Sequence, residues 1–195
     1  MTVFIAVLGA APGVGKSTLC SGLAAALPGR VDHFREEEIL TRPAYAEVAA
    51  EFRAGGEVRP STLLAATSAF VGRCDGDFVV TDALFPYLPS LRAWGHSPAA
   101  LGSFLAALAE IVRPVVLYLD EDPLVALPRA AAREDPTWLD WYLDKLGVPD
   151  VASAASHLCA ERDLTLDLLS SWDLHVLPPA DPVVLLRAAT EIVTG

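Results

Sequence analysis

The chain has 195 residues, of which 53% are hydrophobic, so it is long enough for one sizeable core and too short for two comfortable domains. Its 14 basic and 25 acidic residues give a formal net charge of −11, which opposes binding to nucleic acid or to an anionic membrane surface. Three widely spaced cysteines indicate neither a disulfide framework nor a paired-CxxC zinc site. We expect one domain over residues 1–195, soluble and cytoplasmic, with a homodimer left open as an alternative to a monomer.

Strand and helix patterns alternate along the chain. Strands are expected at residues 3–8, 31–35, 77–82, 114–119 and 173–178, and helices at residues 15–27, 44–56, 61–74, 98–112, 124–133, 136–146, 151–171 and 182–193. Parallel neighbours need crossover connections, so the alternation predicts an α/β three-layer sandwich around a five-stranded parallel sheet. Ligands bind beyond the carboxyl ends of the strands in such folds.

A glycine-rich segment, AAPGVGKS at residues 10–17, directly follows the first strand and matches the phosphate-binding loop pattern, with alanine at the first position where glycine is commoner. Backbone N–H groups of this loop and of the following helix N-terminus can surround phosphate oxygens. In this pattern Lys16 bridges the β- and γ-phosphates, Ser17 binds magnesium, and Thr18 supports the phosphate contacts. The residues expected to contact a nucleotide are Ala11, Pro12, Gly13, Val14, Gly15, Lys16, Ser17 and Thr18.

A carboxylate, Asp82, ends the third expected strand. A carboxylate at this position is typical of the second residue that binds magnesium in phosphate-binding-loop proteins, and it would act partly through a water molecule on the metal. The alternative is a strand-end or helix-capping aspartate. Phe85 and Tyr87 follow in the next turn and either line a substrate pocket or pack in the core.

An acidic cluster, Arg35-Glu36-Glu37-Glu38, follows the second strand, where the acceptor side of the cleft is expected. A carboxylate of Glu36 to Glu38 could take the proton from an acceptor hydroxyl, while Arg35 or Arg42 holds a polar part of the acceptor. Asp82 is a further candidate for the base. The alternative is an acidic first helical turn, which the helix dipole favours.

Two arginines, Arg129 and Arg133, lie one helical turn apart in EDPLVALPRAAARE. We predict that they belong to a lid at about residues 121–147 that folds over the phosphates and neutralises charge as the γ-phosphoryl group moves. The alternative is a solvent-exposed arginine face with Glu134 nearby.

Four other kinds of side chain indicate packing rather than chemistry. Trp138, Trp141 and Tyr142 lie at helical spacing, which favours a buried face over a base-stacking platform. Cys20 is expected to be a packed thiol inside the first helix. The four histidines show no metal-ligand spacing.

Together, the loop at residues 10–17, the acidic end of the second strand, the strand ending at Asp82 and YLDEDPLVALPRAAARE at residues 118–134 resemble the P-loop small-molecule kinases, in particular the thymidylate kinase and deoxynucleoside kinase branch. The resemblance implies a nucleotide-kinase-like sheet of order 2-3-1-4-5, ATP and Mg²⁺ as cofactors, and a catalytic base that matches the region from Glu36 to Glu38. These families carry Asp-Arg-Tyr or Glu-Arg-Ser where this chain has Asp82-Ala83-Leu84.

The chain contains no asparagine and no glutamine, which bears on whether it transfers a phosphoryl group to an acceptor or only hydrolyses the nucleotide. Their lack removes the guanine-specificity motif NKxD, the common water-orienting glutamine and the glutamine loop of ABC-type ATPases. We therefore expect a kinase that moves the γ-phosphoryl group of ATP to a small-molecule acceptor: a nucleoside, a nucleotide or another hydroxylated metabolite. The alternatives are a nucleotide-dependent regulatory or assembly ATPase and a nucleotide-binding module without turnover.

Overall fold

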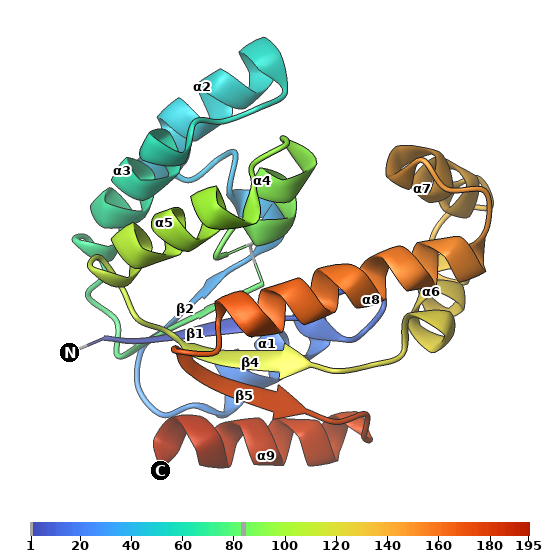
Figure 1. Ribbon diagram of the computed structural model, residues 1–195. Coiled ribbons are helices and arrows are strands. Elements are labelled where there is room, and N and C mark those ends of the chain that lie inside the picture. Colours follow the sequence, from blue (N-terminus) through green and yellow to red (C-terminus); the bar gives the residue numbers. More distant parts are fainter. Residues whose placement is uncertain (1, 83–84) are drawn as a thin grey trace.

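Five parallel strands form one sheet in the order β2-β3-β1-β4-β5, which confirms the predicted sandwich and strand order (Figure 1). The strands are β1 (Val3–Leu8), β2 (Val31–Phe34), β3 (Phe78–Thr81), β4 (Val115–Leu119) and β5 (Asp173–Leu177). The computed structural model describes residues 2–82 and 85–195. Ala83 and Leu84, where the resembling kinases carry their arginine motif, lie outside the described residues.

Helices cover both faces of the sheet (Figure 1). They are α1 (Lys16–Ala26), α2 (Ala46–Gly55), α3 (Pro60–Val71), α4 (Leu88–Ala93), α5 (Pro98–Ala109), α6 (Pro123–Ala131), α7 (Trp138–Leu146), α8 (Val151–Leu168) and α9 (Pro182–Thr194), with 3₁₀ turns η1 (Glu36–Glu38) and η2 (Pro43–Tyr45). On one face α1 and α9 pack together, and α3 and α5 belong to the other. No helix in residues 2–82 or 85–195 is long and apolar enough to cross a membrane.

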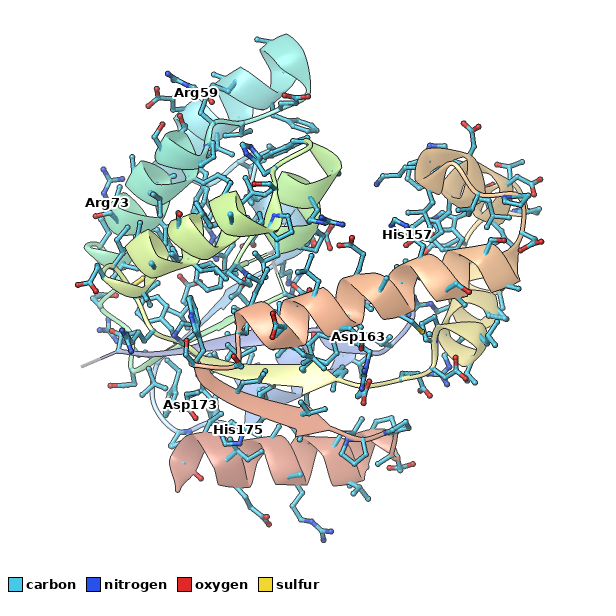
Figure 2. All side chains as sticks on the ribbon, viewed as in Figure 1. Arg59, Arg73, His157, Asp163, Asp173 and His175 are labelled. Atoms are coloured by element: carbon cyan, nitrogen blue, oxygen red, sulfur yellow. The ribbon has the colours of Figure 1, made fainter. Side chains whose placement is uncertain are left out.

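The sheet separates two apolar clusters, one on each face. Ile5, Ala6 and Val7 of the central strand β1 have no exposed surface, because helices cover both sides of it. This burial explains the continuous apolar run in the sequence. At the edge of the sheet, β5 is more exposed, and its Asp173 and His175 side chains form a hydrogen bond of 2.9 Å at the surface (Figure 2).

The elements differ from their predicted bounds mainly at the ends. The short helix α4 was not predicted from the sequence. The helix predicted to reach residue 133 ends at Ala131, so Arg133 lies just beyond α6. Strands β2 and β3 end at Phe34 and Thr81, which places Arg35 and Asp82 at the start of loops on the carboxyl edge of the sheet.

The aromatic residues of α7 are not a buried face. Trp138 and Tyr142 stack on each other at a centroid distance of 5.1 Å and are partly buried, whereas Trp141 is 54% exposed. The prediction of a buried face is therefore wrong for Trp141. The physical reason is that α7 lies at the outer ends of α6 and α8, away from the sheet, where only one side of the helix finds a neighbour (Figure 1).

Candidate nucleotide and acceptor site

The phosphate-binding loop connects β1 to α1 at the carboxyl edge of the sheet. Gly13 and Gly15 take positive φ angles of 85° and 99°, a conformation that glycine adopts without steric cost. Gly15 is the N-cap of α1, and no side chain among the described residues caps that helix. A Cβ atom added at Gly15 would meet nothing within 4 Å. The start of α1 at Gly15 is therefore uncapped and open, the arrangement in which helix N-terminal N–H groups bind phosphate oxygens.

The ammonium group of Lys16 lies within this loop and donates a hydrogen bond of 3.3 Å to the carbonyl oxygen of Ala11. Burial lowers the pKa of Lys16, while the nearby carboxylates of Glu36 and Asp82 act to raise it and Arg133 acts to lower it. Charged groups from four separate segments thus lie close enough to influence one another. An anion bound between Lys16 and Arg133 would compensate both cations.

The carboxylate of Asp82 follows β3 and is only 6% exposed. Its Oδ1 atom is buried without a hydrogen-bond partner among the described residues. The capping alternative does not apply to α4, since the N-cap of that helix is Tyr87. Ser17 and Thr18 are exposed in the first turn of α1. A hydroxyl group and an unpaired carboxylate oxygen are hard oxygen ligands, so these residues fit a magnesium ion.

The acidic cluster divides into two groups. Partial desolvation raises the pKa of Glu36, although its side chain keeps contact with solvent, and Lys16 opposes this shift. Glu38 instead accepts hydrogen bonds from Nε and Nη2 of Arg42, at 3.1 and 2.7 Å. The structure therefore groups Glu36 with Lys16 and Asp82, and separates Glu38 from them by pairing it with Arg42. The alternative also holds in part, because Glu36–Glu38 form the acidic turn η1.

The guanidinium group of Arg42 is fully engaged within the protein. It donates two hydrogen bonds of 2.7 Å to the carboxylate of Asp32, and its Cζ lies 4.5 Å from the centroid of the Phe34 ring. Every one of its nitrogens donates to Asp32 or Glu38. Arg42 was expected, as an alternative to Arg35, to hold a polar part of the acceptor. These contacts leave it poorly suited to that role and give it a structural role between β2 and η1.

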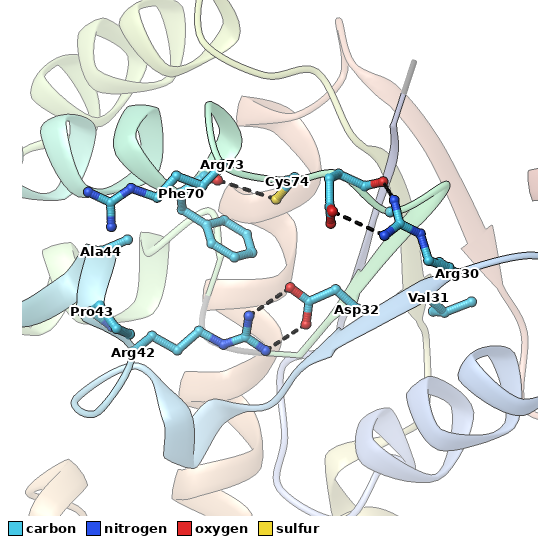
Figure 3. Close-up of a pocket in the computed structure, with 11 residues that line it drawn as sticks. Arg30, Val31, Asp32, Arg42, Pro43, Ala44, Phe70, Arg73 and Cys74 are labelled. Atoms are coloured by element: carbon cyan, nitrogen blue, oxygen red, sulfur yellow. Dashed lines mark hydrogen bonds and ion pairs between the residues drawn. The ribbon is translucent and has the colours of Figure 1, made fainter.

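A hollow of about 460 Å³ lies beside this arginine (Figure 3). It is lined by the start of β2, by Arg42 to Ala44, by Phe70 of α3 and by the turn from Arg73 to Gly76, and the Asp32–Arg42 ion pair lies in its wall. Neither Lys16 nor Glu36 nor Asp82 lines this hollow, so it is separate from the site around Lys16.

The two predicted lid arginines both reach the phosphate-binding loop. With Gly13 to Gly15, Thr18 and the Pro178–Pro182 segment after β5, Arg129 and Arg133 line a cleft of about 520 Å³. Nη1 of Arg129 lies 3.2 Å from Glu121 Oε2 and donates a hydrogen bond of 3.4 Å to the carbonyl oxygen of Gly13. The exposed-face alternative holds in part, because both arginines are exposed, but the acidic partner of Arg129 is Glu121 rather than Glu134.

The aromatic pair after β3 packs in the core. Phe85 and Tyr87 are 8% and 2% exposed. The Tyr87 hydroxyl lies 2.7 Å from the Tyr45 hydroxyl and 3.1 Å from that of Thr67. Of the two interpretations of these aromatics, the structure supports core packing.

Sequence reasoning missed several residues around the site. Glu121 holds Arg129, and the Pro178–Pro182 segment lines the cleft. Lys145 of α7 is close enough to Glu36 to oppose the rise in the pKa of that carboxyl caused by burial. The sequence does carry a signal for the cleft wall, because the segment from Pro178 to Pro182 after the last strand is mostly apolar. Nothing in the local sequence indicates that Lys145 lies near Glu36.

Comparison with known proteins supports the fold. No protein-family model matches the chain, and no curated protein matches it. Among solved structures, the chain is similar to deoxyadenosine kinase from M. mycoides with bound dATP, with a TM-score of 0.56 and 12% identity over 99% of this chain and 100% of that one. At this identity the similarity shows the fold alone. The P-loop nucleotide-kinase fold expected from the resemblance is thereby confirmed.

Proposed function

We propose that this chain is an ATP- and Mg²⁺-dependent phosphotransferase that moves the γ-phosphoryl group of ATP to a small-molecule acceptor. The observation that carries the proposal is that Glu36 and Asp82 both lie within electrostatic reach of Lys16 in the phosphate-binding loop. Nucleotide binding by the loop and Mg²⁺ binding by Asp82 need no further carboxylate near Lys16. Glu36 is therefore available for a second, proton-bearing substrate.

The donor side of this cleft binds the triphosphate between two groups of cations. The N–H groups of the loop and the ammonium of Lys16 contact it from the sheet side, while Arg129 and Arg133 approach from α6 and the turn after it. Arg129 would exchange its contact with Glu121 for a phosphate oxygen. This exchange brings positive charge to the phosphates when the nucleotide binds.

The hydroxyl of Ser17 and the carboxylate of Asp82 would hold Mg²⁺, whose chemistry is to neutralise charge on the β- and γ-phosphate oxygens. Asp82 is already fixed by its burial against the sheet. Its position therefore needs little adjustment when the metal binds.

The acceptor is positioned on the side of Glu36. As the acceptor oxygen forms its bond to the γ-phosphorus, its proton passes to the Glu36 carboxylate, and the bond from phosphorus to the bridging oxygen breaks with its electron pair leaving on ADP. The raised pKa of Glu36 suits a base that must hold this proton, and Lys16 nearby keeps the carboxyl ionised before transfer. The similar solved structure is a deoxyadenosine kinase, which supports a nucleoside as the first acceptor class to test, before nucleotides and other hydroxylated metabolites.

An ATP-consumption screen tests the proposal against a regulatory or assembly ATPase. We expect a strong rate that depends on one acceptor in a panel of nucleosides, nucleotides and other hydroxylated metabolites. Lys16→Ala should abolish that rate with an unchanged circular dichroism spectrum. Arg73→Ala is the matched control, because Arg73 is exposed at the end of α3, across the molecule from α6 and α7 (Figure 2). ATP hydrolysis without any acceptor, stimulated only by a protein partner, would contradict transfer.

A further inference from the structure

Three side chains with metal-ligand chemistry meet between α1 and the sheet. Cys20 comes from α1, His33 from β2 and Asp82 from the end of β3, and one ligand atom of each lies within 4.8 Å of the other two. His33 pairs in register with Val80, and Asp82 lies two residues beyond Val80. Both side chains therefore project from the same face of the sheet, the face that α1 covers.

Two of these three groups are buried without a partner. His33 Nε2 and Asp82 Oδ1 find no hydrogen-bond partner among the described residues. Cys20 has no exposed surface at all, and Asp82 is 6% exposed. Buried polar atoms are nearly always paired, because leaving one unpaired costs about 1–3 kcal/mol. Two unpaired atoms that face one thiol therefore point to a ligand that contacts all three.

We propose that Cys20, His33 and Asp82 bind one transition-metal dication of the Zn²⁺ type. Sulfur and imidazole ligands select such ions over Mg²⁺, which prefers oxygen alone. Three protein ligands leave a fourth tetrahedral position open.

The distances suit this coordination after small side-chain movements. Zinc bonds to sulfur, nitrogen and oxygen are about 2.0–2.3 Å long, so tetrahedral ligand atoms lie roughly 3.5 Å apart. The three atoms already lie within 4.8 Å of one another, and they come from elements that pack directly together. To reach these separations the three ligand atoms therefore need to move by about 1 Å, which rotation of the side chains supplies.

The charges around the site also balance a dication. Burial raises the pKa of the Cys20 thiol, so the metal would displace the thiol proton on binding. The resulting thiolate and the Asp82 carboxylate would then offset its two charges, and His33 would bind as a neutral ligand. Lys16 and Glu36, the next charged groups that act on this cluster, carry opposite signs. The metal would thus enter without leaving a large uncompensated charge in the interior.

Metal occupancy has a consequence for catalysis that rests on the proposed function. Asp82 would serve both the Zn²⁺-type ion and the Mg²⁺ of the phosphate site. A bound Zn²⁺ ion should therefore inhibit phosphoryl transfer, and removing the Cys20 ligand should weaken that inhibition.

Cobalt binding to the whole chain, without nucleotide, tests the site directly. One equivalent of Co²⁺ should produce a thiolate-to-cobalt charge-transfer band and the strong visible bands of tetrahedral cobalt, and Zn²⁺ should displace both. Cys20→Ser should abolish the charge-transfer band, and His33→Asn should weaken binding by at least about tenfold. Cys159→Ser and His157→Ala are the matched controls, since both residues are exposed on α8, and neither should change the spectrum.

Three results would overturn the proposal: no saturable charge-transfer band, a weak octahedral spectrum without sulfur character, or a band that persists in Cys20→Ser. Circular dichroism verifies that each variant folds. Should Cys20→Ser fail to fold, His33→Asn decides, because unchanged cobalt affinity in a folded His33→Asn protein contradicts the site. Since no nucleotide is present, loss of the kinase proposal would leave this result standing, and the reverse also holds.

Discussion

The contact between Arg129 and the phosphate-binding loop yields the sharpest test of the donor site. Arg129 Nη1 lies 3.2 Å from Glu121 and 3.4 Å from the carbonyl oxygen of Gly13, so Glu121 lies within about 7 Å of the loop. In Arg129→Ala this carboxylate, whose side chain is 17% exposed, faces the triphosphate without a compensating cation.

The magnitude follows from the distance. Two like unit charges about 7 Å apart repel by roughly 2 kcal/mol at an effective dielectric constant of about 20, and solvent around the half-exposed arginine makes this an upper value. Arg129→Ala should therefore lose up to about thirtyfold in ATP affinity through this repulsion. Its turnover should fall further, by about 10³-fold, because an arginine that contacts the phosphates also stabilises the charge of the transition state.

The double variant Arg129→Ala/Glu121→Gln separates these two effects. Removing the carboxylate should return the ATP Kd to within a few-fold of the parent chain, while the turnover stays low. Isothermal titration calorimetry gives the Kd, and single-turnover phosphoryl transfer gives the rate, with Arg73→Ala as the unaffected control. The reasoning is refuted if turnover falls no more than affinity does, or if the double variant binds ATP as weakly as Arg129→Ala.

Three further outcomes are expected. Gly13→Ala should destabilise the fold in urea denaturation by about 1–3 kcal/mol for its positive φ alone. The loss should exceed that of Gly56→Ala, because a Cβ atom at Gly13 collides with α6, whereas Gly56, at φ 75°, has open space around it. Equal losses in the two variants would contradict the contact between Gly13 and α6. Arg59 lowers the pKa of Glu51 to about 2, so the stability that this pair contributes at neutral pH should be lost as the pH falls from about 4.5 towards 2. Glu51→Gln should flatten that loss in acid-denaturation curves, and an unchanged curve would contradict the role of the pair. Since burial lowers the pKa of Lys16, ATP binding at alkaline pH should take up protons, because the phosphates favour the charged form of the lysine. Calorimetry in buffers of different ionisation enthalpy measures this uptake, and uptake that persists in Lys16→Ala would contradict the assignment to Lys16.

Features that depend on neighbouring residues in the chain were predictable from the sequence. The apolar run of β1 followed by Gly13 and Gly15 specifies the strand, the loop and the start of α1 locally. The order of the strands followed from a family resemblance and was confirmed. Chain order also placed Asp82 and Glu36 at the same edge of the sheet, because both follow parallel strands.

Features that depend on distant contacts were not predictable. Glu36 and Glu38 are equivalent in the sequence, and only the pairing of Glu38 with Arg42 separates them. The exposure of Trp141 depends on where α7 lies relative to the body. The meeting of His33 with Cys20 depends on the register of β2 against β3 and on the side of the sheet that α1 covers.

The contacts of Arg42 divide the cleft into a fixed side and an adjustable side. By binding both Asp32 on β2 and Glu38 on η1, Arg42 ties the loop that carries Glu36 to the sheet itself. No comparable tie is needed on the opposite side, where Arg129 changes partners. Attempts to change the acceptor preference should therefore keep residues 32–42, because the base retains its place only while these contacts hold.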